Sequence, residues 1–184
     1  PLITTTGSLS ALTTTYGTPS SNTSFTVSGS KMAGGITVTA PTGFEVSTNS
    51  GSGFASAILI GAAGTISNTT VFVRLAATAA VAGTYNAQNI VLTSSGASNV
   101  NIATTPSGNI VSALGITGSF TASNKPYDGN NSASVLTRSL TGVLVGDIAN
   151  VSLSGGTATF ADATAAVGKT VTLAGATLTG SASG

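Results

Sequence analysis

The residues with the clearest capacity for chemistry lie in the segment NKPYDGNNSA, residues 124–133. It combines a lysine, a tyrosine, an aspartate and two neighbouring asparagines in a chain that is otherwise poor in charge. An exposed aromatic ring beside amide and carboxylate groups is the usual make-up of a sugar contact. The ligand candidates are therefore Tyr127, Asp128, Asn130 and Asn131.

The same segment also has the composition of a turn. Pro126 fixes one backbone angle, and Gly129 tolerates the backbone geometry that turns require. On this interpretation Pro126 and Gly129 are structural, while Lys125 and Asp128 are ordinary solvated charges. Tyr127 then either presents an exposed ring or packs on the domain with its hydroxyl capping the turn.

Catalysis finds little support in the residue types available. The chain has no histidine and no cysteine, which excludes Ser–His–Asp and Cys–His arrangements. A pair of carboxylates could in principle act on a glycosidic bond, but no two acidic residues share a local motif. The acidic residues are Glu45, Asp128, Asp147 and Asp162. We expect no catalytic residues and no cofactor.

Metal sites and covalent cross-links are equally weakly indicated. The run from Asp128 to Asn131 offers oxygen ligands but a single charge, and it lacks the spacing of an EF-hand loop. Lys31 and Glu45 are the one suggestive combination for a lysine isopeptide bond, and we expect them to be two solvated charges. Gly168–Thr170 matches only the end of a phosphate-loop motif and is interpreted as a hairpin turn.

Charge and hydropathy also exclude whole classes of partner. Charged residues make up 5% of the chain, against about 25% in an average protein. The five basic residues are dispersed, whereas nucleic-acid binding needs clustered lysine and arginine. The longest apolar stretch, residues 55–63, is too short to span a bilayer as a helix. We expect neither nucleic-acid binding nor membrane insertion.

The pattern of apolar residues predicts an all-β protein. Short segments alternate apolar and polar residues, as in Phe25–Ser28 and Ile36–Thr39, and turn-forming residues separate them. Such spacing is typical of β-sandwiches. We place a domain boundary near residue 113, giving two domains, 1–113 and 114–184. The predicted core residues are Phe25, Phe44, Val73 and Ile90 in the first domain, and Phe120, Val151, Phe160 and Val171 in the second.

Threonine pairs at period two place hydroxyls on one face of several strands. They are Thr37/Thr39, Thr157/Thr159, Thr170/Thr172 and Thr177/Thr179. Regular threonine arrays can bind ice. The simpler interpretation is that threonine is the best polar strand former and keeps a surface with few charges soluble.

Two stretches resemble repeats of bacterial surface proteins. Residues 8–111, with the motif ITVTAPTGFEVS, resemble an immunoglobulin-like sandwich repeat of large exported Bacteroidetes proteins. Residues 116–180, with ITGSFTASNKPYDGNNSASV, resemble the YDG repeat, named for the tripeptide at Tyr127, Asp128 and Gly129. The final strand of that repeat is absent, so we expect the second domain to be incomplete.

The resemblance implies two tandem immunoglobulin-like β-sandwiches in a multi-repeat adhesin, stalk or fibre. It implies an extracellular location at the bacterial cell surface, no catalytic residues, and neighbouring repeats or subunits as partners. An alternative function is glycan binding through loops near Tyr127 or Tyr85. The third is an ice-binding surface.

Overall fold

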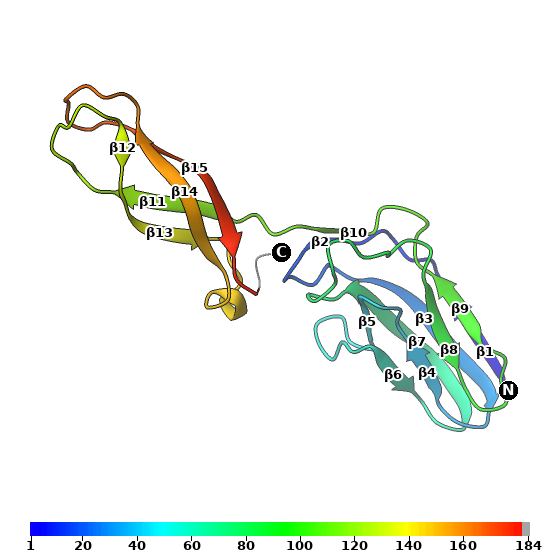
Figure 1. The fold of residues 1–184 in the computed structure, drawn as a ribbon. Helices are drawn as coiled ribbons and strands as arrows, with labels where there is room; N and C mark the ends of the chain where they lie inside the picture. Colours follow the sequence, from blue (N-terminus) through cyan, green and yellow to red (C-terminus); the bar gives the residue numbers. More distant parts are fainter. Residues whose placement is uncertain (182–184) are drawn as a thin grey trace. The chain divides into compact units, whose positions relative to one another are not determined.

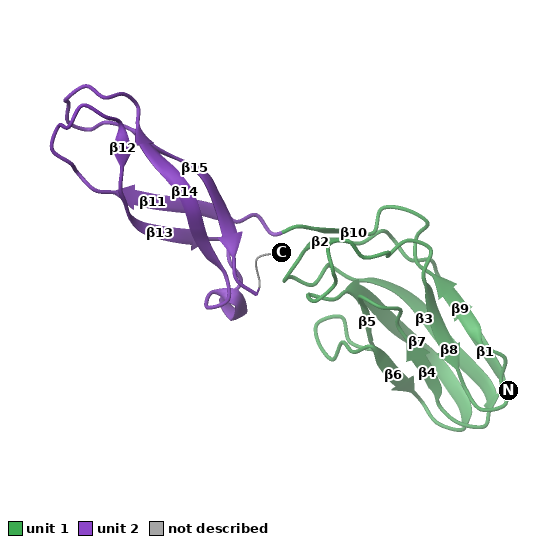
Figure 2. Cartoon of the chain, viewed as in Figure 1, with its two compact units in different colours: residues 1–113 green, residues 114–184 purple. Residues whose placement is uncertain are grey.

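The computed structural model describes residues 1–181 and shows an all-β protein, which confirms the predicted fold class. The described residues form fifteen strands, one short 3₁₀ turn and no α-helix. No helix within this part of the chain is long and apolar enough to cross a membrane. The chain divides into two compact units, residues 1–113 and residues 114–184 (Figure 2).

Unit 1 is built from two four-stranded sheets and one additional strand pair (Figure 1). The first sheet has the order β1 (Leu2–Thr6), β3 (Thr23–Met32), β7 (Gly64–Leu75) and β5 (Phe44–Ser47). The second has the order β6 (Ala57–Ile60), β4 (Ile36–Thr39), β8 (Asn89–Thr93) and β9 (Val100–Ala103). Strands β2 (Thr13–Thr15) and β10 (Ile110–Ser112) pair in parallel. This division of strands resembles that of an immunoglobulin-like sandwich.

The core of unit 1 lies between the two sheets and follows the predicted alternation. Phe25, Phe44, Val73 and Ile90 are all buried, as predicted. Every second residue of the strands points into this layer because successive side chains of a strand lie on opposite faces. Burial of each such side chain stabilises the fold by about 1.5–3 kcal/mol, which explains how a domain without disulfides stays folded.

Unit 2 contains two smaller sheets. Strands β11 (Thr117–Ala122) and β13 (Val135–Thr141) form an antiparallel pair. Strands β12 (Ser132–Ala133), β14 (Ser152–Phe160) and β15 (Val171–Thr179) form the second sheet. The 3₁₀ turn η1 spans Val145–Asp147. Whether this unit is a second immunoglobulin-like sandwich that lacks its final strand stays a prediction.

The core of unit 2 is thinner than predicted. Val151 is buried, with 8% of its surface exposed, but Phe120, Phe160 and Val171 are only partly buried. The prediction that these three side chains are fully buried core residues is therefore wrong, because each is only partly buried. Sheets of two and three strands cover only part of one another, so solvent still reaches the apolar layer from the side.

The exposed face of β11 and β13 carries facing hydroxyl groups that the sequence analysis did not single out. Ser119 lies opposite Ser139 and Thr121 opposite Thr137, and each pair of hydroxyl oxygens is 2.6 Å apart. Cross-strand pairs of this kind stabilise a sheet. These hydroxyls therefore hydrogen-bond to one another, which favours the simple strand-forming role of such residues.

The threonines considered for ice binding do not continue as rows across the second sheet of unit 1. Thr37 of β4 lies between Leu59 and Thr93, and Thr39 lies between Ala57 and Val91. Thr37 thus faces a second hydroxyl on one side only and Thr39 on neither side, so this pair is not part of a regular hydroxyl lattice. No observation in unit 1 favours the ice-binding interpretation.

Candidate functional site

The segment with the ligand candidates forms the loop between β11 and β12, and its backbone is held by side chains of the loop itself. The carboxylate of Asp128 accepts a hydrogen bond from the backbone N–H of Asn130 at 3.1 Å. The side-chain oxygen of Asn130 accepts one from the N–H of Ser132 at 3.0 Å. Gly129 has a φ of 77°, a left-handed conformation that glycine adopts without strain. The segment therefore consists of two successive turns, each closed by an Asp or Asn side chain.

The side chain of Lys125 binds to two other side chains of the same loop. Its ammonium group lies 2.8 Å from the carboxylate of Asp128 and donates to the side-chain oxygen of Asn130 at 2.6 Å. The expectation that Lys125 and Asp128 are ordinary solvated charges is therefore wrong. The hydrogen bond from Lys125 holds the pKa of Asp128 below its usual value, with a smaller contribution from the N–H of Asn130. The carboxylate of Asp128 therefore stays ionised, and the ammonium group of Lys125 lies beside it.

A second loop, between β14 and β15, repeats this arrangement with different residues. The ammonium group of Lys169 forms an ion pair with Asp162 and donates to the backbone carbonyls of Asp162 at 2.9 Å and Thr164 at 2.7 Å. The pKa of Asp162 is well below its usual value, chiefly because of Lys169 and then because of Thr164. Strands β14 and β15 pair antiparallel on either side, so Gly168–Thr170 belongs to a hairpin connection as predicted.

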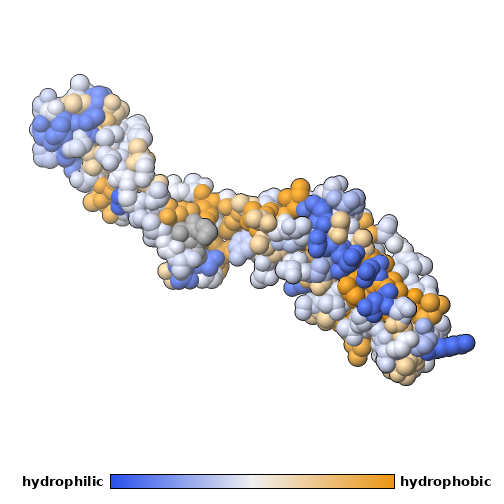
Figure 3. All heavy atoms as spheres, turned by 45° about the vertical axis from the view of Figure 1, so that its right-hand side comes forward, coloured by the Kyte–Doolittle hydropathy of each residue, from blue (hydrophilic) through white to orange (hydrophobic). Residues whose placement is uncertain are grey.

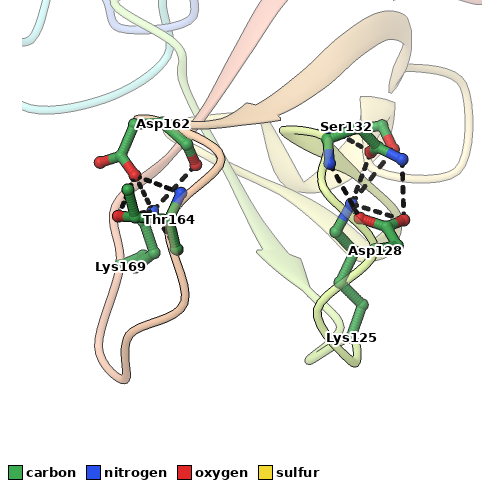
Figure 4. Close-up of polar contacts among 7 residues, drawn as sticks. Lys125, Asp128, Ser132, Asp162, Thr164 and Lys169 are labelled. Atoms are coloured by element: carbon green, nitrogen blue, oxygen red, sulfur yellow. Dashed lines mark hydrogen bonds and ion pairs between the residues drawn. The ribbon is translucent and has the colours of Figure 1, made fainter.

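The two loops lie at the same end of unit 2 because β12 pairs with β14, with Ser132 opposite Thr159. Figure 4 shows the two lysine-centred clusters on facing loops. Between them is an open hollow of about 510 Å³, lined by residues of both loops and by Phe160. Hydrophilic side chains gather at this end of the unit (Figure 3). The hollow thus collects two of the four acidic and two of the five basic residues of the chain.

The structure distributes the sequence-predicted candidates unevenly around this hollow. Tyr127, Asp128 and Asn130 line it, and the Tyr127 ring is 71% exposed, so this ring does not pack on the domain. Asn131 is not among the lining residues, and its carbonyl accepts a hydrogen bond from the N–H of Phe160 at 2.8 Å. Asn131 therefore joins the loop to β14.

The second half of the lining, chiefly Asp162, Thr164 and Lys169, was not predicted from the sequence. They follow the first loop by more than thirty residues, and only strand pairing brings them close. A local signal did exist, since each loop has a lysine within seven residues of an aspartate. In a chain with so few charges, such a spacing indicates an internal ion pair.

The electrostatics of the hollow do not suit acid–base chemistry. A general acid needs a carboxyl group that stays protonated near neutral pH, which requires a raised pKa. Asp128 and Asp162 both have lowered pKa values and remain ionised. Each carboxylate is already bound to an ammonium group, which occupies the position that a cation would take. Residues 1–181 contain no group of three or more potential metal-binding side chains.

Tyr85, the other predicted glycan contact, is unavailable to a ligand. Its ring is 4% exposed and packs edge-on against Phe44, with ring centroids 5.8 Å apart. Its hydroxyl donates to the carbonyl of Ala80 at 2.6 Å. A tyrosine that bonds back to the chain just before a strand is the tyrosine corner of Greek-key sandwiches. The buried Tyr85 ring therefore cannot contact a glycan and has a structural role, while glycan binding through the loops near Tyr85 stays a prediction.

The charges of unit 1 also differ from the cross-link hypothesis. The carboxylate of Glu45 lies 2.9 Å from the guanidinium of Arg74, its cross-strand neighbour. Arg74 in turn stacks over the ring of Phe54, 3.9 Å from its centroid. Glu45 is thus engaged with Arg74. The expectation that Glu45 is a solvated charge is wrong as well.

Comparison with known proteins identifies one part of the chain. A YDG domain is found at residues 112–184, which include both loops of the hollow. A YDG domain is consistent with an adhesin-like repeat module of a surface protein. No curated protein and no solved structure is significantly similar to the chain. The immunoglobulin-like repeat assignment of residues 8–111 and the Bacteroidetes origin stay predictions.

Proposed function

We propose that the chain is a non-enzymatic structural segment of a large secreted or cell-surface adhesin, stalk or fibre. The observation that carries this proposal is the YDG domain at residues 112–184, preceded by a second, independent β-unit. Successive compact β-units in one chain suit a spacer that gives a stalk its length. The proposed partners are neighbouring repeats or subunits of the same protein.

The physical character of both units suits such a role outside the cell. The chain has no thiol that could be oxidised and few groups that titrate near neutral pH. The lysines of the two loops in unit 2 form ion pairs within their own loops, so neither presents an unpaired charge to a partner. A segment of this kind gives length and position to another domain and needs no chemistry of its own.

Antibody labelling of intact cells would test the proposed location. Antibodies against the chain should label unpermeabilised cells of the organism that makes it, and external protease should remove the signal. A cytoplasmic protein detected only after lysis provides the control. Labelling of the chain that likewise required lysis would overturn the proposal.

The hollow in unit 2 favours a second candidate function, the binding of a neutral glycan. Its volume of about 510 Å³ lies within the range of small-molecule sites, roughly 300–1,000 Å³. Tyr127 offers an exposed ring on which a sugar ring can stack, and Asp128 and Asn130 offer polar atoms beside it. Because each ammonium group is paired with a carboxylate, the hollow favours an uncharged polyol over an anion.

A glycan array with the whole chain would test this candidate. We expect binding to at least one neutral glycan, and Tyr127→Ala should weaken it about tenfold or more, because the stacking surface is lost. Tyr16→Ala, which removes a partly exposed tyrosine of unit 1, is the matched control and should bind normally. Absence of glycan binding, or equal loss in both variants, would exclude the hollow as a glycan site.

A further inference from the structure

Strand β15 forms one edge of the three-stranded sheet in unit 2. It pairs with β14 from Val171, opposite Phe160, to Thr179, opposite Ser152. Within residues 1–181 no other strand pairs with β15. The sequence of this edge, VTLAGATLT, contains no charge and no proline. Proteins normally protect exposed edges with charged residues, proline or short strands, since an open edge can pair with another chain.

The apolar side chains of β15 remain incompletely covered. Those that point toward the other sheet are only partly buried, while the residues between them are exposed. The inward set is Val171, Leu173, Ala176 and Leu178. In unit 1, by contrast, central-strand residues such as Val71 and Val73 are fully buried. A strand lying beside β15 would add the missing cover along this row.

The inward row changes phase at the middle of the strand. Inward residues are odd-numbered up to Leu173 and even-numbered from Ala176 onward. The change occurs at Gly175, whose φ of 74° turns the backbone into the left-handed region. As a result, the pattern of partly buried and exposed residues over 171–178 is the same when this stretch is followed in either direction. A self-complementary edge is the requirement for a two-fold symmetric contact.

We propose that β15 pairs antiparallel with β15 of a second copy of this chain, with Val171 of each copy opposite Leu178 of the other. This register also places Leu173 opposite Ala176, so every inward apolar side chain faces another. The two-fold axis then passes between Ala174 and Gly175, where the phase of both strands changes. Because a shift by one residue would place apolar side chains opposite exposed ones, the pattern selects this register.

The contact would be closed and lateral. The two sheets would join into one sheet with β15 of both copies at its centre, and the short strand β12 of each copy at its edges. Because the contact uses the same edge of both copies, it ends at a dimer and does not propagate. It joins two copies of the chain through unit 2 and is therefore distinct from the succession of units within one chain of the proposed shaft.

Sedimentation of the 184-residue chain, from about 1 µM to about 1 mM, tests the pairing and its register. The register places the exposed Thr172 opposite Thr177 of the second copy. The double variant T172K/T177K should weaken dimerisation about tenfold or more, because like charges then lie opposite one another. The variant T172K/T177E should restore it, because each lysine then faces a glutamate. T141K/T157K, which changes exposed residues of β13 and β14, is the matched control and should dimerise like the unchanged chain.

Cross-linking gives a second readout that does not depend on affinity. The chain has no cysteine, so T172C and T177C each introduce a single thiol. A mixture of the two variants should form the disulfide-linked heterodimer faster than either variant forms a homodimer, because the register places these two positions opposite one another. A chain that stays monomeric at all concentrations would overturn the proposal. Equal behaviour of T172K/T177E and T172K/T177K, or no preference for the heterodimer, would overturn it as well.

Discussion

Replacement of Asn109 should destabilise unit 1 more than any exposed polar substitution. Its side chain is buried, and its oxygen accepts a hydrogen bond from the backbone N–H of Leu12 at 2.9 Å. Its amide donates to the carbonyl of Tyr85 at 3.1 Å and to the hydroxyl of Thr105 at 2.8 Å. Asn109→Ala leaves the buried N–H of Leu12 without an acceptor, which costs about 1–3 kcal/mol, and removes two further bonds worth about 0.5–1.5 kcal/mol each. We expect the free energy of unfolding of unit 1 to fall by about 2–6 kcal/mol.

The Asn109→Asp variant separates the donor role of this side chain from its acceptor role. A carboxylate still accepts from Leu12 but repels the carbonyl of Tyr85, so the neutral form is favoured and the pKa of the new carboxyl is raised in the folded state. Stability should therefore be near that of the unchanged chain below about pH 3.9 and should decrease as pH rises through the folded-state pKa. Asn22→Ala removes an exposed hydrogen bond to the carbonyl of Ser50 and is the control, with an expected cost within about 0.5 kcal/mol.

Urea unfolding followed by backbone amide resonances is the suitable assay, because two units need not unfold in one transition. Signals from unit 1 should lose stability in both Asn109 variants, and signals from unit 2 should not change. A loss below about 0.5 kcal/mol in Asn109→Ala would refute the reasoning, since it would show that water replaces these bonds at no cost. An Asn109→Asp variant with pH-independent stability would refute the donor assignment.

Three further predictions concern single side chains. Burial raises the pKa of the Tyr85 phenol above 10.0, so the stability of the folded chain should decrease as pH rises above 10. Tyr85→Phe should therefore show a shallower decline of Tm between pH 10 and about 11.5 than the unchanged chain. An equal decline in both would contradict the raised pKa of Tyr85. Lys169 holds the pKa of Asp162 well below 3.8, so the stability that this ion pair contributes is present above pH 3.8 and is lost as pH falls. In Lys169→Met, an NMR titration should show the pKa of Asp162 returning toward 3.8. An unchanged Asp162 titration would contradict the ion pair between Lys169 and Asp162. Phe120→Ala should lower the free energy of unfolding by about 1–2 kcal/mol, because Phe120 is only partly buried. Phe25→Ala, at a fully buried position, should lower it by about 3–5 kcal/mol in the same denaturant experiment. Equal losses would indicate that the core of unit 2 is closed.

Several strands of unit 1, such as β3 and β4, could be predicted because each has one buried and one less buried face. Alternation such as that of Ile36–Thr39 depends only on the two-residue period of a strand, so the sequence contains it directly. The degree of burial in unit 2 could not be predicted in the same way. Phe120 has the residue type of a core position, but its cover depends on how many strands flank it, which is a property of the sheet.

Of the two loops of the candidate site, only the first could be predicted, because its signal is local in the sequence. The turn at Gly129 is a local feature, and proline, aspartate and glycine in close sequence indicate it. The contribution of Asp162 depends on the pairing of Ser132 with Thr159, which no local pattern reveals. Tyr85 shows the opposite error, because tyrosine is common both in ligand sites and in buried corners, and only its hydrogen bond to Ala80 distinguishes them.

The parallel pairing of β2 with β10 has a mechanical consequence for unit 1. Strand β2 follows β1 near the start of unit 1 and β10 is the last strand of the unit, and backbone hydrogen bonds of 2.9 Å from Tyr16 to Ser112 and from Ile110 to Leu12 extend their pairing. Tension along the chain would pull the two strands in opposite directions along their common axis. All bonds of the pair would then be strained together in shear, whereas an antiparallel hairpin pulled from its open end would unzip one bond at a time. A short parallel pair of strands can thus resist extension of the chain that lies between them.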